Sequence, residues 1–120
     1  MAGFITYDIT KPDCTWSSAN WVYASFLDHV MELFSDEADV VRRLTSSKFN
    51  QSMSLSRLKE EDSALYSRIL NAFKQVCEQI ANRDSLASVN GNVLDEESQN
   101  QFREAIASLA ELLSAKTVSA

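Results

Sequence analysis

The sequence predicts an all-α fold, a four-helix bundle whose second helix is short, preceded by an extended N-terminal arm. Three observations favour this class. Apolar residues recur at helical spacing along several stretches, the chain holds only two glycines and one proline, and its most strand-like segment has no obvious partner. So few glycines and prolines leave little turn chemistry for a sheet of many strands. With 120 residues, 45% of them hydrophobic, the chain is expected to form one domain over residues 1–120.

Residues 1–14 are expected to form the extended arm. The stretch FITYDIT, from Phe4 to Thr10, is rich in β-branched and aromatic residues, and a Lys-Pro-Asp sequence ends it. Two interpretations stay open. The arm either lies over the helices with its aromatic side chains in a groove, or offers an edge that pairs with a partner or with a second copy of the chain.

The first helix is expected within the stretch from Ser17 to Phe34, around which the other helices are arranged. On a helical wheel its apolar residues cover more than half of the circumference, so other helices must surround it. Thr15, Ser17 and Ser18 are the candidate caps of its N-terminus. The remaining polar arc carries Ser25, Asp28, His29 and Glu32, with Trp21 among them.

A short helix and a loop are expected next. Ser35 is the candidate N-cap of a second helix from Asp36 to about Thr45, whose first turn is acidic, as the helix dipole favours. Residues 46–56 contain five serines and irregularly spaced apolar residues, a composition that predicts a loop.

The two longest helices are expected in the second half of the chain. One runs from about Leu58 and ends near Asn82, and Asp95 caps the other. Residues 83–94 form the connection, in which Asn90-Gly91 can make a tight turn. The apolar faces of the helices predict a shared core that contains Phe26, Val30, Leu65, Ile69, Phe73, Phe102, Ile106 and Leu109.

Charge and hydropathy argue against two classes of partner. The net charge of −6 repels phosphate backbones and anionic membranes, so neither nucleic acid nor a membrane is an expected partner. Asp28, His29 and Glu32 interrupt the most apolar stretch before it reaches the length of a transmembrane helix. The first residues do not resemble a signal peptide, and the expected location is therefore cytoplasmic.

Residue types and spacings provide no catalytic or metal site. The single histidine, His29, cannot supply the paired ligands of a di-iron bundle, and no nucleophile elbow or phosphate-binding loop accompanies it. Cys14 and Cys77 lie 63 positions apart without a CxxC pattern, so both thiols are expected to be free. We expect no enzyme activity, no catalytic residues, no cofactor and no metal.

Acidic residues concentrate between Asp28 and Asp39, before the first basic residue of this region, Arg42. Asp28 and Glu32 form a like-charge i,i+4 pair, which slightly destabilises an isolated helix. The segment is either an ordinary solvated face or a surface that binds a basic partner, with Trp21 as an anchor. Trp21 itself is either covered within the fold or exposed and available for binding. The candidate partner-binding residues are Trp21, Asp28, Glu32, Asp36, Glu37 and Asp39.

Three classes of function stay open. The leading hypothesis is a small acidic inhibitor of the immunity or antitoxin type, which neutralises a basic protein such as a toxin nuclease. The alternative is a homo-oligomeric helical adaptor or regulatory bundle, for example a homodimer. An enzyme or small-ligand carrier with a site inside the bundle is the third class. The first rests on charge, size and missing catalytic groups.

Overall fold

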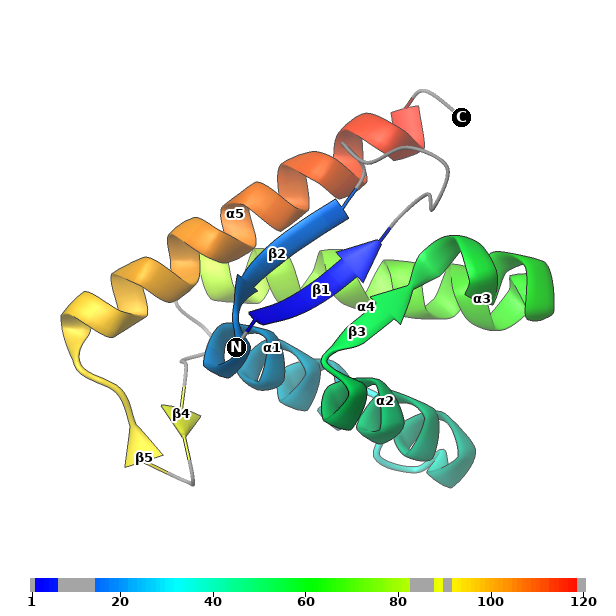
Figure 1. Cartoon of the computed structure of the whole chain (residues 1–120), viewed down its shortest axis with the longest axis horizontal. Helices are drawn as coiled ribbons and strands as arrows, with labels where there is room; N and C mark the ends of the chain where they lie inside the picture. The colour runs from blue at the N-terminus through cyan, green and yellow to red at the C-terminus, as the bar shows by residue number, and fades with distance from the viewer. Residues whose placement is uncertain (1, 7–14, 83–87, 90–91, 119–120) are drawn as a thin grey trace.

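A computed structural model describes residues 2–6, 15–82, 88–89 and 92–118 (Figure 1). These residues are mostly helical, as predicted, but they also form a small three-stranded sheet and a two-stranded hairpin. The prediction of a simple four-helix bundle is therefore wrong, because the described part of the chain holds five helices and pairs its N-terminal segment into a sheet.

The N-terminal segment is the central strand of this sheet. Strand β1 (Ala2–Thr6) pairs antiparallel with β2 (Thr15–Ala19) and parallel with β3 (Ser52–Ser54), in the order β2-β1-β3. The segment is extended, as predicted, but both of its edges are already paired, so it is not an arm. Its partners escaped prediction because they are short and rich in serine, which hides the alternation that marks a strand. Residues 7–14 of the predicted arm lie outside the described residues.

The sheet has one buried face and one exposed face. Ile5 stands opposite Trp16 on one side and Met53 on the other, and all three side chains are buried. Phe4, the next residue along β1, is 43% exposed on the outer face. In Figure 1 the sheet lies in front of α4 (Ser63–Ala81), while α5 (Glu96–Val118) runs beside β2.

The first helix, α1 (Asn20–Glu32), begins directly after β2. Thr15, Ser17 and Ser18 therefore belong to a strand. The prediction that one of them caps the helix is wrong. The N-cap position is Ala19, which makes no side-chain capping bond. Pairing with β1 fixes the backbone of this segment in extended form up to Ala19, and the helix starts where the pairing stops.

The second helix is longer and begins later than predicted. Helix α2 (Ala38–Asn50) has Glu37 at its N-cap in place of Ser35, and it ends at Gln51, which adopts a left-handed backbone with φ of 58°. Within the last turns, the Thr45 hydroxyl donates to the Val41 carbonyl at 2.7 Å. The Ser47 hydroxyl donates to the Arg43 carbonyl in the same way, at 3.2 Å. Such back-bonding to position i−4 satisfies hydroxyl groups inside a helix, so these side chains are compatible with the helix here.

The predicted loop at residues 46–56 is therefore wrong over most of its length. Its first residues complete α2, β3 follows, and α3 (Leu55–Glu61) begins with Ser54 as its N-cap. The Ser54 hydroxyl oxygen accepts a hydrogen bond from the Arg57 amide at 3.2 Å. Serine is thus used here for capping and strand formation in addition to turns.

The long helices of the second half agree with prediction. The face predicted from Leu58 onward is present, but it is divided at Asp62, whose carboxylate accepts from the Leu65 amide at 3.1 Å and caps α4. Asp95 precedes α5 and accepts from the Ser98 amide at 2.8 Å. Between them, β4 (Ser88–Val89) pairs with β5 (Asn92–Val93), whereas the predicted turn at residues 90–91 lies outside the described residues.

The predicted core is confirmed at seven of its eight positions, and the eighth, Leu65, is half-buried. The rings of Phe26 and Phe73 meet edge to face, with centroids 5.1 Å apart. Two polar bonds connect the sheet and helices around this core. The Trp16 indole donates to the Ala105 carbonyl of α5 at 2.9 Å, and the Tyr23 hydroxyl donates to the Ser47 carbonyl of α2 at 2.9 Å.

Candidate functional site

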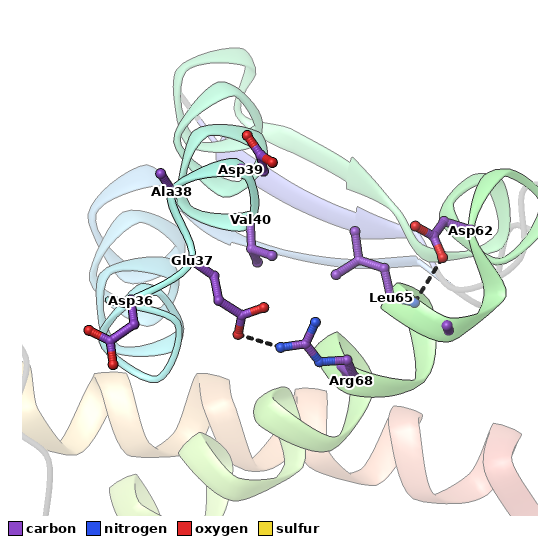
Figure 2. A pocket seen from close by; sticks show the side chains of 9 residues that line it. Asp36, Glu37, Ala38, Asp39, Val40, Asp62, Leu65 and Arg68 are labelled. Atoms are coloured by element: carbon purple, nitrogen blue, oxygen red, sulfur yellow. Dashed lines mark hydrogen bonds and ion pairs between the residues drawn. The ribbon is translucent and has the colours of Figure 1, made fainter.

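A cleft of about 550 Å³ lies between the start of α2 and the start of α4 (Figure 2). One wall comes from the connection between α1 and α2 and from the first turn of α2, and the other comes from the residues around the α3–α4 break. The cleft is lined by Asp36, Glu37, Ala38, Asp39, Val40, Asp62, Ala64, Leu65 and Arg68. It contains four carboxylates and one guanidinium, so its local charge is strongly negative.

Local sequence explains why these carboxylates meet. The chain turns tightly after α1, where the Glu37 amide donates to the Phe34 carbonyl at 2.8 Å, and this turn carries Asp36 and Glu37 to the N-terminus of α2. The break between α3 and α4 at Asp62 places a capping carboxylate on the opposite wall. Both walls are helix N-termini, where acidic side chains are favoured by the helix dipole.

An ion pair crosses the cleft. The Arg68 guanidinium donates to the Glu37 carboxylate, and the same guanidinium lies over the Phe34 ring, 5.5 Å from its centroid. In Figure 2 the Glu37 and Arg68 side chains point toward each other, while Asp36 and Asp39 lie farther out at the rim, with their carboxylates directed away from this pair. The hydrogen bond between Arg68 and Glu37 lowers the pKa of Glu37 and raises the pKa of Arg68. Both groups are therefore charged at neutral pH. The cleft has four carboxylates and one guanidinium, so three carboxylates are left without an internal cation.

The cleft unites only half of the predicted site. Asp36, Glu37 and Asp39 line it, but Trp21, Asp28 and Glu32 do not. Asp39 lies 3.8 Å from Arg42, and both side chains are almost fully exposed, a setting in which ion pairs contribute little.

Asp28 of the acidic pair on α1 has a charge partner on another helix, which the sequence did not reveal. The Lys48 ammonium on α2 lies 2.8 Å from the Asp28 carboxylate. Asp28 therefore connects two helices, and its like-charge neighbour Glu32 is left exposed. The idea that this pair exists only for binding loses its main support, although its role in binding stays a prediction.

Trp21 is neither fully covered nor fully exposed. Its ring lies 6.3 Å from that of Phe102 on α5, at an angle of 30°, and the side chain packs against the edge of the core. Within the described residues, the ring that lies against Trp21 is Phe102 of α5. A separate surface on α1 around Trp21 stays a prediction, distinct from the cleft.

Two charged residues of the cleft were missed at the sequence level. Asp62 carried a readable signal, because an aspartate just before an apolar helical run is a candidate N-cap. Arg68 carried none, since its partner Glu37 is 31 positions away and no periodicity relates them.

The described residues contain no group of three His, Cys, Asp or Glu side chains arranged to hold a metal ion. The Cys77 thiol is free and buried, and burial raises its pKa to about 12. It is therefore protonated and unreactive at neutral pH. Cys14 lies outside the described residues.

In the described part of the chain, no helix combines the length and apolarity needed to cross a membrane.

Comparison of the chain with protein-family models, with curated proteins and with solved structures gives no match.

The ion pair predicts a defined pH dependence of stability. Because the pKa of Glu37 is lower in the folded chain, its contribution is present above the ordinary value of 4.5 and is lost as the pH falls through the folded pKa. We expect Glu37→Gln to lower the melting temperature at pH 7 and to have less effect as the pH falls below about 4.5. Thermal melts of both proteins across this range, with Glu104→Gln on the exposed side of α5 as control, measure it. A difference that does not change with pH would contradict the assignment.

Proposed function

We propose that this chain is a non-enzymatic protein-binding domain that neutralises a basic partner, as small inhibitors of the immunity or antitoxin type do. The observation that carries the proposal is the acidic cleft between α2 and α4, whose lining includes four carboxylates and one guanidinium. A lysine or arginine of the partner would enter this cleft and balance the excess negative charge. Complementary charge of this kind speeds association and selects partners.

The internal arginine indicates which cation the cleft suits. Arg68 is held by the Glu37 carboxylate and by the face of the Phe34 ring. A carboxylate with an aromatic ring is a favourable setting for a planar guanidinium. A partner arginine would meet Asp36 and Asp39 at the rim and Asp62 on the opposite wall. Arginine is therefore the preferred side chain for this cleft.

A peptide titration tests the proposal without knowledge of the native partner. The probe is a capped Gly-Arg-Gly peptide, and its control is the same peptide with citrulline, which has nearly the same shape and no charge. We expect the arginine peptide alone to shift backbone amide signals of residues 36–40 and 62–68 in a nitrogen-15 spectrum, and this effect should weaken as salt is added. Equal shifts from the two peptides would contradict the proposal.

Paired variants localise the effect to the cleft. Asp36→Asn with Asp39→Asn should weaken binding of the arginine peptide by about tenfold, because two rim charges are lost. Glu104→Gln with Glu111→Gln changes the net charge equally, from −6 to −4, on the exposed side of α5. This control should bind as the wild type does. Equal weakening by both pairs would mean that only the overall charge matters.

Self-association is the second candidate function, and one observation favours it. Phe49, at the end of α2, is 81% exposed, an unusual setting for a large apolar side chain. A homo-oligomer would cover it. Sedimentation equilibrium over a wide range of concentration, with Phe49→Ser as control, decides between a monomer and an assembly of copies.

A further inference from the structure

Strand β3 has an unpaired edge. In the described residues β1 pairs on both sides, whereas β3 pairs only with β1. The Phe4 amide donates to the Gln51 carbonyl at 3.0 Å, and Phe4 stands opposite Ser52. In a parallel ladder this places the backbone groups of Met53 toward β1, and those of Ser52 and Ser54 toward the other side. These amide and carbonyl groups are a template for an added strand.

The free edge opens into a pocket. A hollow of about 280 Å³ lies between α2 and α3 and is lined by all three residues of β3. Its helical walls include Arg43 of α2 and Arg57 of α3. Neighbouring helices therefore flank this edge without filling the space beside it, and Figure 1 shows β3 running between them. An extended segment has room to lie along the strand.

The charge of this pocket is opposite to that of the acidic cleft. Arg43 forms an ion pair with Glu61, and Arg57 forms none with any residue that the structure describes. The pocket thus carries one uncompensated positive charge in a chain whose net charge is −6. A carboxylate is the group that this arginine would bind, with two hydrogen bonds where the geometry allows.

We propose that the free edge of β3 receives an extended acidic segment of another protein, added as a fourth strand with a carboxylate against Arg57. Main-chain hydrogen bonds to Ser52 and Ser54 would hold the segment, and Arg57 would select its charge. A second copy of this chain fits less well, because pairing β3 with β3 would bring the arginines of both copies together. This surface shares no residue with the acidic cleft, and it does not depend on the function proposed above.

A designed peptide tests this surface in the full chain. The probe is a capped heptapeptide of alternating valine and glutamate, and its charge-reversed control alternates valine and lysine. We expect the glutamate peptide alone to shift the Ser52 and Ser54 amide signals and to slow their hydrogen exchange. N-methylation of alternate peptide amides should abolish binding, because the added strand then cannot pair. Binding that survives methylation, or equal binding of the lysine peptide, would overturn the proposal.

Arginine variants separate a local contact from general charge. Arg57→Gln should weaken binding of the glutamate peptide by about tenfold. Arg42→Gln, which changes an exposed arginine of α2 outside the pocket, should leave this binding unchanged. Similar losses in both variants would overturn the proposal. So would protection of Ser52 and Ser54 that depends on protein concentration without peptide, since it would assign the edge to a second copy. The arginine tripeptide reports on the acidic cleft separately, so either proposal can fail alone.

Discussion

Phe73→Ala is expected to lower the free energy of unfolding by about 3 to 5 kcal/mol, the range for truncation of a fully buried phenylalanine. The Phe73 side chain has no exposed surface, and its ring packs edge to face on Phe26 of α1. Truncation removes this contact and leaves a cavity where α4 meets α1. Urea denaturation monitored by circular dichroism measures the change.

A matched phenylalanine is available as the control. Phe49→Ala is the same chemical change at a position that is 81% exposed. It should change the free energy of unfolding by no more than about 0.5 kcal/mol. A loss below about 1 kcal/mol for Phe73→Ala would mean that the helices pack in a different register.

The helices could be predicted because burial leaves a periodic trace in the sequence. Phe73 and Ile69 on α4, and Phe102 and Ile106 on α5, recur at intervals of three or four residues, and all four are buried. The strands left no such trace. β3 has three residues, of which only Met53 is apolar and buried, and β2 offers only Trp16. Patterns this short are indistinguishable from loops until the partner strand is known.

The candidate site could be predicted in part, for a similar reason. Asp36, Glu37 and Asp39 are close in sequence, so their shared charge was visible without a structure. Arg68 reaches the same cleft only because the fold places the start of α4 across from the start of α2, and a pairing over 31 positions has no local signal. Lys48 likewise compensates Asp28 from another helix. Long-range ion pairs are therefore what a charge count overlooks.

Helix α2 separates two pockets of opposite charge. Its N-terminal turn borders the acidic cleft, and its C-terminal half borders the arginine-containing pocket at β3. The ion pair between Arg43 and Glu61 lies in the arginine-containing pocket. Glu61 is followed directly by Asp62, which lines the acidic cleft. A chain with a net charge of −6 thus keeps positive charge beside the edge of β3. This arrangement discourages edge-to-edge pairing of identical copies and favours acidic strands from other proteins.

Gly3→Ala is expected to destabilise the fold by about 3 kcal/mol, at the upper end of the usual cost of overpacking. A Cβ atom on Gly3 would stand 2.2 Å from the Tyr23 Cγ atom, far inside van der Waals contact. The Tyr23 ring cannot withdraw easily, because it is fully buried and its hydroxyl donates to the Ser47 carbonyl at 2.9 Å. The Gly3 backbone does not adopt the left-handed conformation, so lack of space is the reason for glycine here.

A double-mutant cycle with Tyr23→Ala tests this explanation. Alanine removes the Tyr23 Cγ and ring atoms, which include the atom nearest to the new methyl group, and keeps only the Cβ atom at 2.4 Å, so Gly3→Ala should cost less in that background than with tyrosine. Tyr23→Phe keeps the ring and removes only its hydrogen bond, and it should therefore preserve most of the cost. Denaturant unfolding of the single and double variants gives the coupling energy. An equal cost of Gly3→Ala with tyrosine and with alanine at position 23 would show that the ring is not what requires glycine at the centre of the sheet.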